Sequence, residues 1–241
     1  IIKTPGRHIK QNFNNDVGLK NISFFIHLSE PSLKSEYNAI KSLALIDNVK
    51  ILSKKFKSRL IYFSSSSVYG DQSKESYNER SPVNESDEYT KLKLNNERIV
   101  IENGGMVVRL SNVIGSEMHK NNVFGDIKNQ IIKKNSDILV FTKKSIRDYI
   151  YVKDVCNFIK IVVDSKVTKN EIYNIGSGEG KSVEEIIDLL SNHFNHNFES
   201  IIETKKTNRM SCNILDISKA YLDFNWVPLS SFRDIIKEIY K

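Results

Sequence analysis

The sequence predicts an α/β fold in which a doubly wound parallel sheet carries a smaller α/β lobe. Short apolar segments alternate with longer segments of helical periodicity, which is the pattern of parallel strands connected by helices. No repeat, low-complexity linker or long polar tract interrupts this alternation. A chain of 241 residues is long enough for one sizeable core with a small appended lobe. We assign residues 1–115 to the sheet domain and residues 116–241 to the smaller lobe, which is interleaved with it.

Five segments of the first domain show this alternation. Residues 23–28 (SFFIHL) and residues 60–63 (LIYF) are short apolar runs that end in polar residues, as buried strands do. Residues 38–56 carry apolar side chains mostly at helical spacing, and a second helix is predicted near residues 89–101. Residues 106–110 (MVVRL) complete the set as a third strand.

The second half of the chain has shorter elements. Residues 123–132 are predicted to be helical, and residues 138–141 and 147–152 are predicted to be extended. Ser182 and Glu185 have the spacing of a capping box, which predicts that a helix begins there. The last helix is predicted from apolar residues at i, i+3, i+4 and i+7, namely Phe232, Ile235, Ile236 and Ile239.

Composition excludes several classes of protein. Hydrophobic residues make up 39% and charged residues 27%, which is ordinary for a soluble globular protein. No apolar run approaches the roughly 18 residues of a membrane span, and the first residues lack the apolar core of a secretory signal. Cys156 and Cys212 have no metal-ligand spacing and suggest a reducing compartment. We therefore expect a cytoplasmic protein with no metal site and no membrane partner.

The chain is basic, with a formal net charge of +7 and a pI near 9.2. Its lysines are scattered, and the densest cluster, at residues 54–59, is brief and ends a helical pattern, where cations are favoured by the helix dipole. Nucleic-acid binding is therefore only an alternative, and we expect no nucleic-acid partner. A basic surface also suits an enzyme whose substrate carries a pyrophosphate, because it concentrates anions.

The motif Tyr-x-x-x-Lys occurs three times, as Tyr37/Lys41, Tyr89/Lys93 and Tyr149/Lys153. Any one of them could be an exposed helical pair worth a few tenths of a kcal/mol at most. The first pair precedes the strand that ends in serines, and the third lies in a segment whose alternation looks extended. Only the second opens a helix after that strand, so its two side chains are expected to share one face of the helix.

That proximity is what acid–base chemistry needs. A free phenol titrates near pH 10, whereas proton transfer is most effective when the group titrates near pH 7. Closing a gap of about three pH units takes about 4 kcal/mol of preferential stabilisation of the phenolate, and a neighbouring ammonium is a plausible source. Together with Ser65 at the end of the preceding strand, Tyr89 and Lys93 are the candidate catalytic residues.

Five sequence blocks occur in a characteristic order: IYFSSSSVYG, then Tyr89-x-x-x-Lys93 with Glu97, then VVRLSNVIG, RDYIYVKDV and YNIGSG. In these blocks the chain resembles the extended short-chain dehydrogenase/reductase family, specifically its NAD-dependent nucleotide-sugar epimerases and dehydratases. The resemblance runs from about Phe25 to the C-terminus. It implies a Rossmann-like, dinucleotide-binding domain over residues 1–115 and a substrate-binding lobe over residues 116–241.

The resemblance also implies roles for single residues. Ser65 would hydrogen-bond the reacting sugar oxygen, Tyr89 would be the acid/base, and Lys93 would hold the nicotinamide ribose and activate Tyr89. NAD or NADP would be contacted by Leu28, Ser29, Ser64, Tyr89, Lys93 and Leu110. The nucleotide-diphosphate sugar would be contacted by Ser65, Ser66, Asn112, Arg147 and Arg209.

Several of these residues also have ordinary structural interpretations. Ser65 could simply end a strand, and Asn112 could form a turn after one. Arg147 could be the salt-bridge partner of Asp148. His27, at the end of the first predicted strand, is expected to be structural.

The sequence departs from the family in two ways. The 4,6-dehydratases of the family have Asp-Glu directly after the catalytic Ser or Thr, whereas this chain has Ser66 and Ser67, which cannot act as carboxylate bases. The glycine-rich phosphate turn is also missing, since only Gly6 and Gly18 precede Phe25 and a βαβ unit needs roughly 30 residues. We expect that turn to lie before Ile1, and without it the chain should bind dinucleotide poorly.

The sequence therefore predicts an NAD(P)-dependent enzyme that modifies a nucleotide-activated hexose, with a role in polysaccharide biosynthesis. C4 epimerisation by transient oxidation is the first hypothesis, and NADPH-dependent reduction of a 4-keto sugar is the second. A non-catalytic protein that kept the fold is the alternative of another class. The resemblance further implies a homodimer formed through the helices at residues 38–56 and 89–101.

Overall fold

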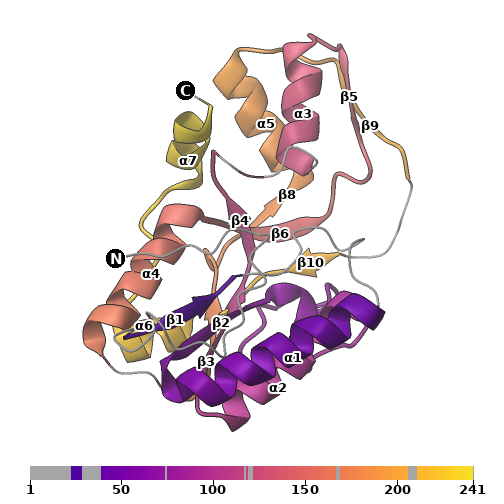
Figure 1. Ribbon diagram of the computed structural model, residues 1–241. Helices are drawn as coiled ribbons and strands as arrows, with labels where there is room; N and C mark the ends of the chain where they lie inside the picture. The colour runs from indigo at the N-terminus through magenta and orange to yellow at the C-terminus, as the bar shows by residue number, and fades with distance from the viewer. Residues whose placement is uncertain are drawn as a thin grey trace. The chain divides into compact units, whose positions relative to one another are not determined.

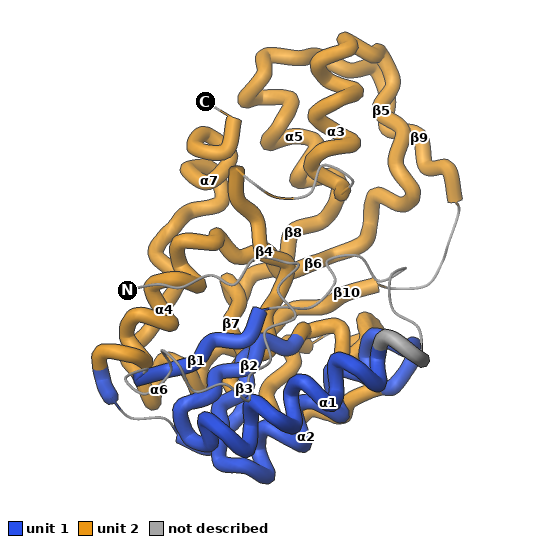
Figure 2. Tube along the Cα trace, in the orientation of Figure 1, with its two compact units in different colours: residues 1–64, 85–108, 165–172 blue, residues 65–84, 109–164, 173–241 orange. Residues whose placement is uncertain are grey.

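A computed structural model describes residues 23–28, 39–73, 75–116, 118, 122–166, 169–205 and 211–240. The chain forms two compact units (Figure 2). Unit 1 contains residues 1–64, 85–108 and 165–172, and unit 2 contains residues 65–84, 109–164 and 173–241. The chain crosses between the units several times, so these units differ from the predicted domains, which meet at residue 115. The division into a dinucleotide-binding domain and a substrate-binding lobe stays a prediction.

Unit 1 is organised around parallel strands. Strand β1 (Phe25–His27) pairs in parallel with β2 (Leu60–Ser65), and β3 (Met106–Leu110) is the other neighbour of β2. The three strands occur where the apolar runs predicted them. Strand β2 extends two residues beyond the predicted end, because Ser64 and Ser65 continue the extended backbone.

Two helices cover these strands. Helix α1 (Ala39–Phe56), followed by a short 3-10 turn η2 (Lys57–Arg59), contacts α2 (Glu88–Glu102) along its length (Figure 1). Helix α2 begins with a capping box in which Asp87 accepts a bond from the Thr90 N–H (2.7 Å) and Thr90 accepts one from the Asp87 N–H (3.1 Å). The core between helices and strands consists of Val49, Leu52, Phe56, Leu60, Tyr62, Val100 and Val107.

Unit 2 is built around strand β6 (Ile146–Tyr151). Strands β4 (Asn112–Ile114) and β10 (Cys212–Asn213) pair with β6 in parallel, and β8 (Gly180–Ser182) pairs with it antiparallel. Because the order is β10-β6-β4, β6 is hydrogen-bonded on both sides and its residues are central to the unit.

The other strands of the chain are short. Strands β5 (Asp137–Val140) and β9 (Ser200–Glu203) form a separate parallel pair. Strand β7 (Ile172–Ile175) runs into unit 2, where the Ser111 N–H donates to the Ile175 carbonyl at 3.0 Å. A 3-10 turn, η3 (Ser66–Tyr69), follows β2 directly.

Five helices belong to unit 2: α3 (Val123–Ile132), α4 (Val152–Ser165), α5 (Val183–Phe194), α6 (Ser218–Phe224) and α7 (Phe232–Ile239). The predicted bounds of α3 are confirmed. The capping box of Ser182 and Glu185 is also confirmed, with reciprocal bonds of 3.1 and 2.7 Å at the start of α5. The segment predicted as extended to Val152 instead ends at Tyr151, because α4 begins at the next residue.

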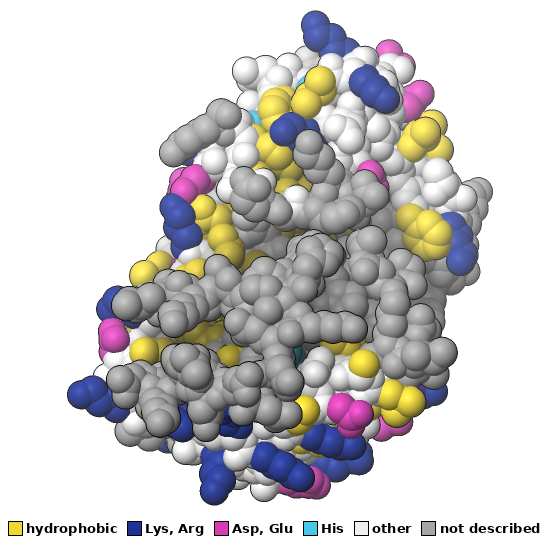
Figure 3. All heavy atoms as spheres, viewed as in Figure 1, with side chains coloured by type: hydrophobic (Ala, Val, Ile, Leu, Met, Phe, Trp, Pro, Cys, Tyr) yellow, Lys and Arg dark blue, Asp and Glu magenta, His cyan; other side chains and the backbone are white. Residues whose placement is uncertain are grey.

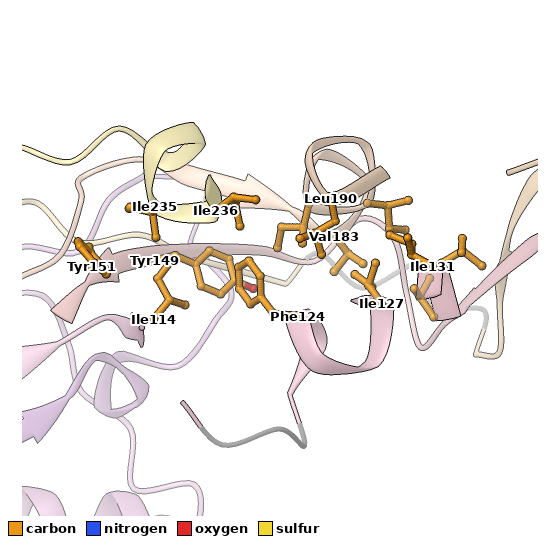
Figure 4. Close-up of a cluster of buried hydrophobic side chains, with 14 residues drawn as sticks. Ile114, Phe124, Ile127, Ile131, Tyr149, Tyr151, Val183, Leu190, Ile235 and Ile236 are labelled. Carbon is orange, nitrogen blue, oxygen red and sulfur yellow. The ribbon is translucent and has the colours of Figure 1, made fainter. Parts of the chain in front are cut away.

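The core of unit 2 gathers side chains from β6 and several helices (Figure 4). Phe124 of α3 meets Tyr149 of β6 edge to face, with ring centroids 5.1 Å apart, and lies 5.9 Å from Phe232 of α7. Ile235 and Ile236 are buried in the same cluster, as the spacing of the last helix predicted. Burial of Tyr149 raises the pKa of its phenol to about 12.

In the view of Figure 3, Lys and Arg side chains of the described residues lie at several separate places. Within the described ranges, no helix is both long enough and apolar enough to cross a membrane.

Phe124 is a direct test of this core. Phe124→Ala removes a buried ring that touches two others, so we expect the free energy of unfolding to fall by about 3–5 kcal/mol in a urea titration. The matched control is Leu222→Ala, which truncates a side chain that is 79% exposed and should change stability by less than about 0.5 kcal/mol. Equal losses in the two variants would contradict this description of the core.

Candidate active site

Lys93 lies at the centre of the polar part of unit 1. Its side chain is only 7% exposed, and its Nζ donates to the Phe63 carbonyl of β2 at 2.8 Å. The same Nζ lies 5.1 Å from the ring centroid of Tyr62 and 5.6 Å from that of Tyr89. These distances are within the range of cation–π attraction. The structure therefore brings Tyr89 and Lys93 together on one face of α2, as their i, i+4 spacing predicted.

Two more side chains of α2 reach β2. The Ser64 hydroxyl donates to Oε1 of Glu97 at 2.5 Å, and Asn96 Nδ2 donates to the Tyr62 hydroxyl at 3.3 Å. Both Glu97 and Asn96 are buried. These bonds set the register of α2 against the strand that leads into Ser65. The Ser64 hydroxyl donates its proton to Glu97, so toward a cofactor its side chain could act only as a hydrogen-bond acceptor.

Ser65, the last residue of β2, lies in unit 2. Its Oγ accepts a hydrogen bond from the Ser67 N–H at 3.2 Å and so caps the turn η3. The next residue, Ser66, is buried, and its carbonyl accepts from Asn213 Nδ2 at 3.0 Å. Asn213 also donates to the Gly70 carbonyl at 2.5 Å, so one side chain holds both ends of η3.

Arg147 on β6 is surrounded by acceptors. Its guanidinium donates to the carbonyl of Ser211 at 3.0 Å and to the hydroxyl of Ser211 at 2.6 Å. It also pairs with Asp71 at 3.3 Å, and the structural interpretation that paired it with Asp148 is wrong about the partner. The Arg147–Asp71 pair is partly exposed, so a pyrophosphate binding at Arg147 would have to share it with this carboxylate.

Leu110 and Asn112 lie on either side of the link between β3 and β4. Leu110 ends β3 and is half-buried. Asn112 begins β4, is exposed, and donates from Nδ2 to the main-chain carbonyl of Asp148 at 3.0 Å. Its amide oxygen is the part of the side chain that this bond leaves for another donor.

A network around Tyr69 joins three of the five sequence blocks within unit 2. Arg109 donates to the Tyr69 hydroxyl at 2.8 Å, and that hydroxyl donates to Asn174 Oδ1 at 2.8 Å. The Asn174 N–H in turn donates to Glu79 at 2.8 Å. Burial raises the pKa of Tyr69 to about 12 despite the nearby guanidinium, and burial also raises the pKa of Glu79. The network fixes the end of η3 opposite Ser65.

Four buried polar residues have no site role in the prediction from sequence, and they are Asn96, Glu97, Arg109 and Asp148. Three of them lie inside the blocks that carried the family resemblance, and Glu97 is one helical turn after Lys93. Arg109 gave the clearest signal, because a charged residue between apolar neighbours of a strand is almost always paired when buried.

The described residues of unit 1 fit a dinucleotide. Strands β1 and β2 are parallel, so they end at the same edge, which is where cofactors bind in sheets of this kind. His27 is buried and stacks on Tyr62, with ring centroids 5.8 Å apart, as its structural interpretation predicted. Leu28, directly after it, is 67% exposed and offers an apolar surface at that edge.

Ser29 and Arg209, and the glycines Gly6 and Gly18, lie outside the described residues. Among the residues that are described, no three His, Cys, Asp or Glu side chains are grouped so that they could hold a metal ion.

A family model described as the NAD dependent epimerase/dehydratase family matches residues 27–176, which include the first four blocks and the first four residues of the fifth. The chain belongs to this family. The predicted membership in the extended short-chain dehydrogenase/reductase enzymes is thereby confirmed, and so is their dependence on NAD or NADP.

Two relatives and one structure illustrate the likeness. A protein of Methanocaldococcus jannaschii assigned as a UDP-glucose 4-epimerase is 24% identical over 95% of this chain and 79% of its own length. The GDP-6-deoxy-D-talose 4-dehydrogenase of Aggregatibacter actinomycetemcomitans is 29% identical over 76% of this chain and 64% of its own length. RMD of Pseudomonas aeruginosa, solved with NADPH, has a TM-score of 0.78 at 19% identity, covering 93% of this chain and 81% of that one. This structural likeness confirms the Rossmann-like α/β fold.

The Ser64–Glu97 bond is expected to stabilise unit 1. Ser64→Ala removes a hydrogen bond to a buried carboxylate, so the free energy of unfolding should fall by about 1.5–3 kcal/mol in urea. Ser53→Ala is the matched control, because the Ser53 hydroxyl is also buried in unit 1 but has no hydrogen-bond partner among the described residues. It should be neutral or slightly stabilising. A loss in Ser53→Ala as large as that in Ser64→Ala would show that the bond to Glu97 is not the cause.

Proposed function

We propose that the protein catalyses NAD(P)-dependent epimerisation at C4 of a nucleotide-activated hexose, with UDP-glucose as the first candidate. The observation that carries the proposal is the Tyr89–Lys93 pair, held by buried polar bonds to the strand that ends in Ser65. The 4-epimerase assignment of the Methanocaldococcus jannaschii relative supports the choice of reaction. Ser66 and Ser67 disfavour dehydration, because that reaction in the family uses two carboxylates at these positions.

The catalytic residues divide the work at one sugar oxygen. The bound dinucleotide supplies hydride transfer. Tyr89 removes the proton from the C4 hydroxyl and returns it, while the Ser65 hydroxyl hydrogen-bonds the same oxygen. The Lys93 ammonium, 5.6 Å from the ring centroid of Tyr89, would offset the negative charge that develops on the phenol oxygen during proton transfer.

The remaining predicted residues have binding roles in this proposal. Leu28, Ser29, Ser64 and Leu110 would hold the dinucleotide together with Tyr89 and Lys93. Ser66, Asn112, Arg147 and Arg209 would bind the nucleotide-diphosphate sugar, and residues 116–241 would supply the two arginines. Guanidinium groups suit the pyrophosphate because they offer paired donors.

We further propose a cytoplasmic homodimer. Helix α1 presents Leu43 and Ile51 to solvent, 64% and 44% exposed, which gives unit 1 an apolar helical surface for a second copy. Size-exclusion chromatography with light scattering would measure the mass directly. A monomer at micromolar concentration would contradict the dimer and leave the proposed chemistry unaffected.

Reduction of a 4-keto nucleotide sugar by NADPH is the second candidate. The dehydrogenase of Aggregatibacter actinomycetemcomitans, which acts at the same carbon, favours it. Both reactions use the same residues, so the cofactor decides between them. An epimerase retains NAD through purification and interconverts UDP-glucose and UDP-galactose without net oxidation. A reductase consumes one NADPH for each keto sugar reduced, and turnover in neither assay would favour a non-catalytic protein.

Tyr89→Phe and Lys93→Met test the assignment. Each removes a group that acts on the proton in transit, so kcat should fall by about 10²- to 10⁴-fold while the far-UV circular dichroism spectrum is retained. The control is Lys153→Met, which changes the lysine of a rival Tyr-x-x-x-Lys match. Lys153 is exposed and pairs with Glu238, so its replacement should leave kcat within about twofold. Normal turnover in both Tyr89→Phe and Lys93→Met would refute the assignment.

A further inference from the structure

We propose that Asp148 is a positioning residue for the nucleotide-sugar site. In this inference, its carboxylate holds the segment at residues 211–215, and that segment places both the Arg147 guanidinium and the turn η3 that follows Ser65. The functional part of the inference rests on the proposed function, whereas its structural part does not.

The Asp148 carboxylate is fully buried and accepts four hydrogen bonds. Oδ1 accepts from the N–H and the hydroxyl of Ser177, both at 2.7 Å. Oδ2 accepts from the N–H of Gly178 at 3.2 Å and from that of Leu215 at 3.3 Å. One side chain therefore ties the loop after β7 to the segment after β10. Every donor suits the ionised carboxylate, although burial raises the pKa of this group.

The loop that contacts Asp148 has no room for a side chain at its first glycine. A Cβ added at Gly176 would overlap Oδ2 of Asp148, and Gly178 has a φ of +75°, which favours glycine. Gly176 is thus explained by the approach of its backbone to this carboxylate, and Gly178 by its backbone conformation. The block lies outside the proposed catalytic set and supplies three of the four bonds to Asp148.

The segment at residues 211–215 connects the Asp148 carboxylate to Arg147 and to the turn η3. The Asp148–Leu215 bond holds one end, and Ser211, which accepts two bonds from Arg147, lies at the other. Pairing of β10 with β6 and main-chain bonds to Asp71 and Tyr77 hold the segment as well. Between the two ends, Asn213 donates to the carbonyls of Ser66 and Gly70. Release of Leu215 would loosen both the guanidinium and η3.

Adjacent residues of a strand point to opposite faces, and β6 uses this alternation. Arg147 reaches Asp71 and Ser211 on one side, while Asp148 reaches Ser177 and Leu215 on the other. The main-chain carbonyl of Asp148 also accepts from Asn112, another proposed substrate residue. One strand position therefore supports three parts of the same binding site.

Asp148→Asn is the informative variant. An amide of the same shape has one acceptor oxygen and two donor hydrogens, so it cannot accept all four bonds and must face donors with donors. Asp154→Asn is the matched control. Asp154 is also buried in unit 2, and its carboxylate accepts the backbone N–H groups of Leu229 and Ser230 at 3.0 and 3.3 Å, away from residues 211–215.

The first measurement is hydrogen–deuterium exchange of the full chain without ligands. Asp148→Asn should increase exchange in peptides covering residues 211–216 and 66–70, whereas Asp154→Asn should increase it near residues 229–230 only. Unchanged exchange at residues 211–216 in Asp148→Asn would overturn the positioning role, whatever the enzyme's activity.

The second measurement is steady-state turnover of UDP-glucose. Asp148→Asn should raise KM for UDP-glucose about tenfold with a smaller change in kcat, because weakened sugar-nucleotide contacts act mainly on binding. KM should be unchanged in Asp154→Asn. An equal rise of KM in both variants, or no rise in Asp148→Asn, would overturn the inference about substrate binding. Absence of turnover in the wild type would instead contradict the proposed function, and the exchange experiment would still decide the structural part.

Asn213→Ala is the second test variant, to be used if Asp148→Asn does not fold. It removes the link from the segment to η3 and leaves the Asp148 carboxylate in place. Exchange should then rise at residues 66–70 but not at residues 176–178, and KM for UDP-glucose should rise as well. Protection of residues 66–70 equal to that of the wild type would overturn the proposed path from Asp148 to Ser65.

Discussion

The buried polar bonds between α2 and β2 are the constraint on which the catalytic arrangement depends. A lysine ammonium is costly to bury, and Lys93 is buried because the Phe63 carbonyl and two aromatic rings surround it. The Ser64–Glu97 bond then fixes the helix against the strand at a second point. The same bonds that stabilise unit 1 therefore hold Tyr89 in a defined place relative to its own lysine.

In unit 2 a buried negative charge, rather than a buried ammonium, holds separate segments together. Its most buried carboxylate among the described residues is that of Asp148, which accepts backbone N–H groups from two segments. The guanidinium of Arg147, by contrast, stays partly exposed beside Asp71. The Asp148 carboxylate must be buried to bind the backbone, whereas the Arg147 guanidinium must stay accessible to bind an anion. The two residues are adjacent on β6, and each has the environment that its role needs.

The fold and the residues that resemble a family could be predicted from the sequence because they depend on local patterns. Apolar runs predicted β2 and β3, the spacing of Tyr89 and Lys93 predicted a shared helical face, and Ser182 with Glu185 predicted the start of α5. The contacts of Asp148, Asn213 and Glu97 could not be predicted, because each joins residues at least 29 positions apart in the chain. The alternative that paired Arg147 with Asp148 was wrong for the same reason, because the actual partner, Asp71, lies far from Arg147 in the sequence.

The interleaving of the two units has a consequence for how the chain reaches its native state. Each unit is assembled from three separate stretches, so no single cut of the chain separates one whole unit from the other. Strand β2 runs out of one unit and into the other at Ser64 and Ser65. Long loops must close before either core is complete, which slows folding and leaves apolar strands exposed for longer during synthesis. We therefore expect the chain to fold as a whole. The proposed catalytic serine, Ser65, lies where β2 passes from one unit to the other.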